Sequence, residues 1–169
     1  MDPDRCALFI SLRPRYAELL LEGRKTVELR RVQPDVLRGT LALLYASSPV
    51  RALVGLAIID QVHVAKSPEI WRAYGTRTGL TRDEYEEYFD GAAAAVAILL
   101  QDVQRLHTPV TLSDLRKGRD WFRPPQSFRY LDAEQTASLV SAAGDTVPSL
   151  PLVWRARAVA RNQRLAPAT

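Results

Sequence analysis

Apolar residues along this chain gather in short runs that are separated by polar or by Pro- and Gly-containing segments. Five of these runs have the length and composition of strands: residues 7–12, 25–32, 40–46, 52–64 and 92–100. In the second run, Val27 and Leu29 alternate with polar residues, which predicts a half-buried strand. The run 92–100 is rich in alanine, but it is short for a buried helix and is predicted to be a strand.

Signals for helix starts and ends fall between these predicted strands. Pro14 suits the first turn of a helix that ends near Gly23. Further short helices are predicted from Ser67-Pro68 to Gly75, after the capping box Thr81–Glu84, at residues 111–116, and from Asp132 to Gly144. Strands dominate and the helices are inserted among them, which favours an α+β fold built on a small barrel over a doubly wound sheet.

Length and charge predict one domain with a basic tail. The chain has 169 residues, and we expect a domain at residues 1–145 and a Pro-containing linker and tail at 146–169. Segment 151–169 holds four arginines and no acidic residue. Its charge of +4 equals the formal net charge of the whole chain. The remainder is neutral, so nucleic-acid binding would need local basic patches. The tail is either an accessory arm or a packed barrel strand, because Trp154 and Ala156 alternate with Arg155 and Arg157.

Several protein classes are not expected from this composition. The longest uncharged apolar run, residues 91–100, is half the length of a membrane span, and the acidic N-terminus does not resemble a secretion signal. A single cysteine, Cys6, cannot form an internal disulfide, so we expect a cytoplasmic protein. With His63 and His107 as the only histidines, we expect no metal and no cofactor.

The first group of candidate residues lies at the start of the first predicted helix. Arg13 and Arg15 follow Ser11 where the helix dipole disfavours cations, an arrangement that makes sense if an anion such as a phosphate docks there. The alternative is a pair of arginines exposed to solvent on a turn.

The second group lies on the strand that follows. Thr26, Glu28 and Arg30 share one face of the strand, and Lys25 opens it. A lysine beside a carboxylate can act as a base, a charge stabiliser or an anion anchor. The alternative is a charged outer face with weak cross-strand pairs.

The third group is a segment of interleaved aromatic and basic residues at 121–130. Arg123, Gln126 and Phe128 have the chemistry to stack nucleic-acid bases and read their edges. The alternative is that Trp121, Phe122 and Phe128 fill the barrel while prolines stiffen the loop.

These motifs together resemble a known family. The chain contains Ser11-x-Arg13-Pro14-x-Tyr16-Ala17, then Gly23-x-Lys25-Thr26-x-Glu28-x-Arg30, then Gly55 within a strand, and Pro125-Gln126-Ser127-Phe128. This pattern, over roughly residues 6–131, is similar to ASCH domains, which are relatives of the PUA RNA-binding superfamily. Arg13 stands where a lysine is common, which keeps the charge but changes the geometry toward phosphate.

The resemblance implies a PUA-like β-barrel flanked by short helices, with a basic cleft between the first helix and the barrel. It also implies recognition of RNA or a modified nucleotide. Some family members are ribonucleases, and others are amidohydrolases acting on acetylated cytidine. In the amidohydrolases a lysine, a threonine three residues later and a glutamate on a following strand form the catalytic set. Here Lys25 matches, but Glu28 takes the threonine position and only Asp60 could replace the glutamate.

We therefore predict a protein that binds RNA or another nucleic acid. The predicted binding site comprises Ser11, Arg13, Arg15, Tyr16, Lys25, Glu28, Arg30, Ser47, Ser48, Arg123, Gln126, Ser127 and Phe128. The alternative is a metal-independent hydrolase, a ribonuclease before an acetylcytidine amidohydrolase, in which Lys25 stabilises the transition state and Glu28 transfers a proton. A third possibility is a small-nucleotide sensor that controls a partner protein. No membrane partner is expected.

Overall fold

A computed structural model describes residues 6–144 of the chain. The strands are β1 (Ala7–Leu12), β2 (Val27–Arg30), β3 (Leu41–Ala46), β4 (Ala52–Ala65), β5 (Ala95–Thr111) and β6 (Phe128–Leu131). The helices are α1 (Pro14–Leu21), α2 (Ser67–Tyr74), the 3₁₀ turn η1 (Gly75–Arg77), α3 (Arg82–Phe89), α4 (Leu112–Arg116) and α5 (Ala133–Ala142). The basic tail predicted at 146–169 lies outside the described residues.

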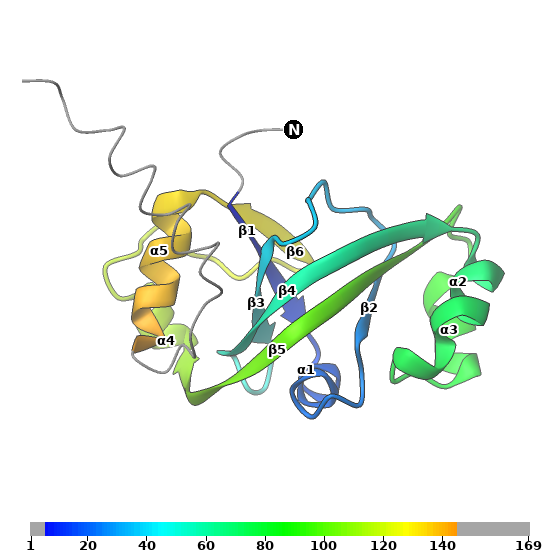
Figure 1. Cartoon of the computed structure of the whole chain (residues 1–169). Coiled ribbons are helices and arrows are strands. Elements are labelled where there is room, and N and C mark those ends of the chain that lie inside the picture. The colour runs from blue at the N-terminus through cyan, green and yellow to red at the C-terminus, as the bar shows by residue number, and fades with distance from the viewer. Residues whose placement is uncertain (1–5, 145–169) are drawn as a thin grey trace, which may run out of the picture.

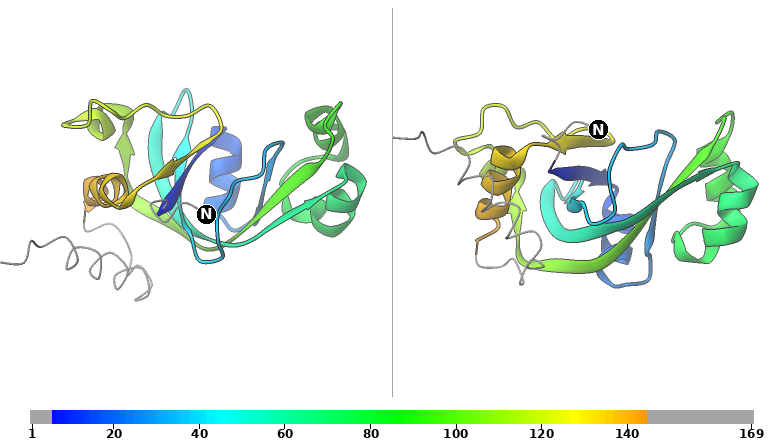
Figure 2. Two further views of the ribbon diagram at one scale, coloured as in Figure 1. Left: turned by 90° about the horizontal axis from the view of Figure 1, so that it is seen from above. Right: turned by 45° about the horizontal axis from the view of Figure 1, so that its top comes forward.

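All six strands form one sheet in the order β2-β5-β4-β3-β1-β6. Only β1 and β3 are parallel, so their carboxyl ends, Leu12 and Ala46, lie side by side. The sheet curls into a half-barrel, as two further views show (Figure 2). The predicted α+β fold with a barrel-like sheet and short helices is confirmed.

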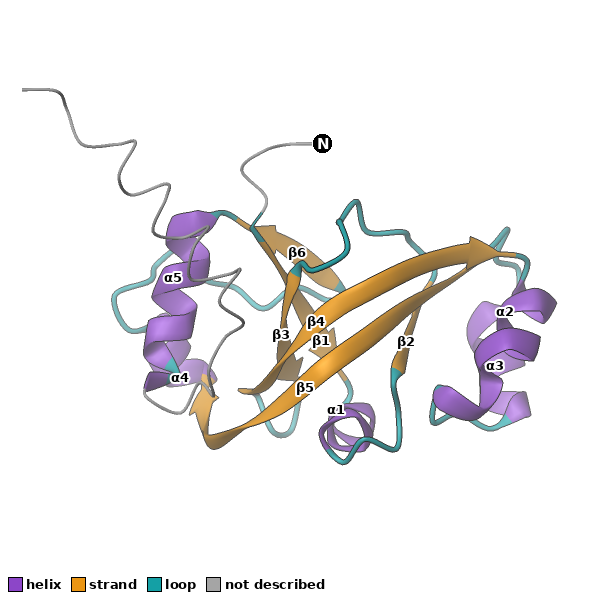
Figure 3. Ribbon diagram, in the orientation of Figure 1, coloured by secondary structure: helices purple, strands orange, loops and turns teal. Residues whose placement is uncertain are grey.

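The helices lie at the two ends and along one side of this sheet. β4 and β5 form a long ribbon that runs from α4 and α5 at one end to α2 and α3 at the other, with α1 between them (Figures 1 and 3). One face of the curled sheet buries the cluster around Phe9, Leu43 and Phe122. The other face buries α1 through Ala17 and Leu20.

Gly55 in β4 explains how α1 comes so close to the sheet. A Cβ atom at this position would lie 2.5 Å from Cδ2 of Leu21 and 2.7 Å from the carbonyl oxygen of Gln104. Real Cβ atoms do not approach other atoms that closely, so glycine lets the helix end pack directly on the strand. This contact fixes α1, and with it the residues at both of its ends.

Three strand predictions need correction. The predicted strand 92–100 begins at Ala95 and continues to Thr111, because its polar half pairs with β4 although it lacks an apolar pattern. β6 was not predicted as a strand; its backbone pairs with β1. The strand predicted at 25–32 is restricted to Val27–Arg30, and all four residues are buried instead of every second one.

Candidate nucleic-acid interface

Two buried cations share one buried carboxylate in the turn after α1 and on β2. Lys25 Nζ lies 3.2 Å from Glu28 Oε2, and Arg30 Nη2 lies 2.9 Å from Glu28 Oε1. The side chains of these three residues are at most 9% exposed. We call Lys25, Glu28 and Arg30 the buried triad. Its formal charge is +1, which is unusual because buried charges are normally paired.

Lys25 has no hydrogen free for a ligand. Its ammonium group donates to the carbonyl oxygens of Val27 and Thr78, both at 2.7 Å, and faces Glu28. The ring of Tyr16 lies 5.4 Å away and covers the remaining side. Burial lowers the pKa of Lys25, Glu28 opposes this effect, and the Arg30 charge adds to it. The geometry gives Lys25 a role in holding the turn after α1 onto η1.

Because the pKa of Lys25 is lowered in the folded protein, the free energy of unfolding should vary with pH in the alkaline range. Between the lowered pKa and the ordinary lysine value of 10.5, the unfolded chain binds more protons at Lys25 than the folded chain. The free energy of unfolding should therefore gain a contribution as pH rises through that interval. Urea unfolding at pH 7 to 10 should show this gain in the wild type and not in Lys25→Met. Parallel pH curves for the two proteins would contradict the assignment.

Arg30 connects β2 at one edge of the half-barrel to β1 and the start of β6 at the other. Its Nη2 donates to the carbonyl oxygen of Ser11 at 2.8 Å, and its Nη1 donates to Ser127 Oγ at 3.1 Å. Ser11 in turn donates through Oγ to the carbonyl oxygen of Pro125 at 2.7 Å. The structure thus brings together five predicted site residues: Ser11, Lys25, Glu28, Arg30 and Ser127.

The arginines predicted at the start of α1 have different surroundings. Arg15 is exposed and pairs with Glu84 of α3, at 2.7 Å. Arg13 is exposed and forms no ion pair with any residue in 6–144. Of these two, Arg13 has the side chain that is available to an anion.

A second group of basic residues stands next to Arg13, where β1 and β3 end. The backbone amide of Ser47 donates to the carbonyl of Leu12 at 2.8 Å, and that of Arg51 donates to Ser47 at 3.1 Å. Leu112 at the start of α4 donates to the carbonyl of Arg51 at 2.8 Å. These bonds tie the end of β1, the turn 47–51 and α4 into one surface.

Tyr45 lies beneath this surface: it is 3% exposed and belongs to the core cluster around Phe9. Burial raises its pKa, while the nearby guanidinium groups of Arg51 and Arg116 act in the opposite direction. Neither arginine forms an ion pair within the described part of the chain. We call Arg13, Tyr45, Ser47, Arg51 and Arg116 the basic end. Cations without carboxylate partners around a hydroxyl form a suitable site for a phosphate.

Sequence reasoning missed Tyr45, Arg51 and Arg116. Ser47 and Ser48 were predicted as site residues, and Ser48 is exposed in the turn, where the Ser48–Pro49 peptide is cis. Arg51 has φ of 51°, a conformation that residues other than glycine seldom adopt outside special sites. The sequence did offer one indication of Arg51: it stands two residues after Pro49, in the turn that follows the apolar run 40–46.

The predicted group at 121–130 is divided between core and surface. Phe122 is fully buried and packs edge-on against Phe9 at 5.3 Å, so it holds the loop in place. Phe128 is half-buried and packs edge-on beside Tyr130. Arg123 donates to backbone carbonyls of its own loop, and Gln126 is exposed.

The described residues contain no group of three or more His, Cys, Asp or Glu side chains that could hold a metal ion. Within residues 6–144, the longest helices are too short and too polar to span a bilayer.

Comparisons with known proteins place the chain in a family. The family model of the ASCH domain matches residues 10–104. A protein of Zymomonas mobilis named an ASCH domain-containing ribonuclease is 37% identical over 139 residues, which are 82% of this chain and 93% of that protein.

Solved structures agree with this match. The crystal structure of ASCH from Zymomonas mobilis has a TM-score of 0.77 at 36% identity and covers 82% of this chain and 96% of that one. The N-terminal domain of Staphylothermus marinus McrB shares the fold alone, with a TM-score of 0.53 at 12% identity over 80% of this chain and 93% of that one. The predicted resemblance is confirmed, and the chain belongs to the ASCH domain family.

Proposed function

We propose that this protein is a ribonuclease that binds single-stranded RNA across the basic end and cleaves it there without a metal ion. The observation that carries the proposal is that Arg51 and Arg116 both lie near the hydroxyl of Tyr45, and that backbone hydrogen bonds join Arg51 to the turn after β3 and to the start of α4. Within the described residues no carboxylate pairs with Arg51, with Arg116 or with Arg13, which follows the end of β1. The ribonuclease name of a relative at 37% identity supports RNA as the ligand.

The proposed chemistry needs no group beyond the RNA and this surface. The 2′-hydroxyl oxygen of one ribose attacks the neighbouring phosphorus, and the bond to the 5′ oxygen of the next nucleotide breaks. The 2′-hydroxyl proton passes to solvent, and the leaving 5′ oxygen takes up a proton. Arg51 and Arg116 would stabilise the charge that builds on the phosphate oxygens, and the buried Tyr45 would hold the guanidinium of Arg51 in place through its hydroxyl.

The buried triad has a supporting part in this proposal. Lys25 is saturated with acceptors and Glu28 lies between two cations, so neither would touch the RNA. Arg30 would hold Ser11 and Ser127 in place at the edge of the same surface. This assignment replaces the predicted roles of Lys25 as charge stabiliser and Glu28 as proton carrier.

A labelled single-stranded RNA and a DNA strand of the same sequence test the proposal. The pure protein should cut the RNA with EDTA present, and it should bind the DNA without cutting it, because DNA lacks the attacking hydroxyl. Affinity for the DNA should fall as salt rises, with a slope of about −2 in log K against log salt for three phosphate contacts. Cleavage that EDTA abolishes, or the absence of binding to either strand, would overturn the proposal.

A further inference from the structure

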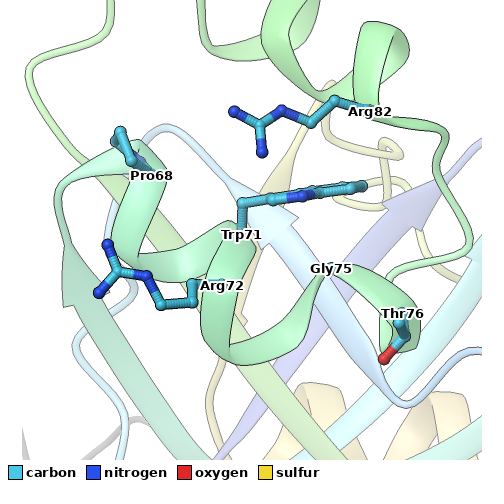
Figure 4. Close-up of a pocket in the computed structure, with 6 residues that line it drawn as sticks. All are labelled: Pro68, Trp71, Arg72, Gly75, Thr76 and Arg82. Carbon is cyan, nitrogen blue, oxygen red and sulfur yellow. The ribbon is translucent and has the colours of Figure 1, made fainter.

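A depression on the surface formed by α2, η1 and α3 lies apart from the residues described so far. Its volume is about 530 Å³. Its lining consists of Pro68, Trp71, Arg72, Gly75, Thr76 and Arg82 (Figure 4). Two arginines and a tryptophan belong to this lining and no acidic residue does, although α3 is acidic elsewhere.

Trp71 is held in a fixed position in this depression. A Cβ atom on Gly75 would lie 2.9 Å from the indole ring, so the ring packs against bare backbone there. The ring of Tyr85 lies 4.8 Å away, and the guanidinium of Arg82 lies 5.4 Å from the indole over its face (Figure 4). Gly75 thus lies against one side of the indole and Arg82 lies over the other, so the guanidinium of Arg82 is the outer layer of this stack (Figure 4). Guanidinium planes, like aromatic rings, stack on nucleic-acid bases.

The two arginines in the lining differ in their partners. Arg82 forms an ion pair with Glu86 one turn further along α3. Arg72 is exposed and has no ion pair among residues 6–144, so its charge is available to a phosphate. Thr76 adds a hydroxyl at the same surface.

Hydrogen bonds connect this lobe to the start and end of α1. Arg77, next to Thr76, donates through Nε to Thr26 Oγ1 at 2.9 Å, and its carbonyl accepts from the amide of Thr26 at 3.0 Å. Glu84 of α3 pairs with Arg15, two residues from Arg13 of the basic end. α1 lies between the end of the sheet with α4 and this lobe (Figure 1), so a strand that contacts both surfaces would pass over α1.

We propose that this depression is a second contact for the same single-stranded RNA, in which an unpaired base stacks on the guanidinium of Arg82 that Trp71 supports, and the adjoining phosphate binds Arg72. The inference rests on the proposed function and extends it from one phosphate site to a strand that spans two surfaces. The second contact requires bases that are free to unstack, so double-stranded RNA would lose it.

The test measures affinity for a single-stranded DNA, which the proposed activity leaves intact. Trp71→Leu should weaken binding about fivefold or more, since a stacked base contributes roughly 1–3 kcal/mol. Arg72→Glu should weaken it severalfold and reduce the salt slope by about 0.7, the value for one phosphate on a single strand. Arg38→Glu, a charge change at an exposed arginine in the loop before β3, serves as the matched control and should have little effect.

A fluorescence measurement keeps the proposal testable if Trp71→Leu fails to fold. In a variant with Trp121 and Trp154 replaced by Phe, added DNA should quench the emission of Trp71 at the concentration that saturates binding. If the DNA binds the wild type, both variants and the control with equal affinity, the second contact is wrong and the proposed function is unaffected. Binding of an acidic peptide, and of no nucleic acid, in the depression would also contradict the second RNA contact. A wild type that binds no strand would overturn both.

Discussion

Replacing Glu28 by glutamine is expected to lower the free energy of unfolding by about 3–5 kcal/mol, the cost of removing one partner from a buried ion pair. Glu28 pairs with two cations, and both of them are at least 90% buried. Glutamine has nearly the same shape, so the loss would reflect charge and not packing. Chemical unfolding followed by circular dichroism measures the effect.

Two variants serve as controls for this prediction. Glu22→Gln removes an exposed carboxylate that pairs with Arg24, and it should change stability by less than about 1 kcal/mol. Lys25→Met should cost less than Glu28→Gln, because Glu28 and Arg30 still neutralise each other. Equal losses in Lys25→Met and Glu28→Gln would mean that packing, and not the shared carboxylate, stabilises this region.

Replacing Arg51 by alanine is expected to reduce the rate of RNA cleavage about 100-fold or more, as removal of one donor to a transition-state oxyanion does in other enzymes. Tyr45→Phe, which keeps the ring in the core, should reduce cleavage without a comparable loss of stability. Gel analysis of labelled RNA under single-turnover conditions measures both rates.

Arg24→Ala is the matched control for Arg51→Ala, because it also removes one exposed guanidinium. It should cleave RNA at the wild-type rate. Cleavage by Arg51→Ala at that same rate would exclude the basic end as the catalytic surface, while binding would still be open to test by its salt dependence.

The helices and the apolar strands were predictable from the sequence because their signals are local. Pro14, the capping box at Thr81 and Glu84, and Asp132 each mark a helix start that the structure contains. The second half of β5 carries no such signal. Gln101, Gln104 and Arg105 pair with β4 through their backbone, and Asp102 lies at a register shift between them, so the side chains give no strand period.

The burial of the charged strand could not be predicted, because the groups that enclose it are distant in the sequence. Thr78, which accepts a hydrogen bond from Lys25, lies 53 positions away, and Ser127, which faces Arg30, lies 97 positions away. From its own alternation, β2 looks like an outer strand with a charged face. The curl of the sheet brings its edge toward β1 and β6, and that curl is a property of the whole fold.

The pairing of β1 with β6 joins the first and last strands along residues 6–144, and this has a consequence for synthesis on the ribosome. β1 emerges about 120 residues before β6 is complete, which at 5–20 residues per second corresponds to roughly 6–24 s. During that time Phe9 lacks Phe122, and Arg30 lacks Ser127. The nascent chain therefore carries an exposed strand edge and an apolar face for seconds, an interval in which chaperones that bind unfolded segments have access to it.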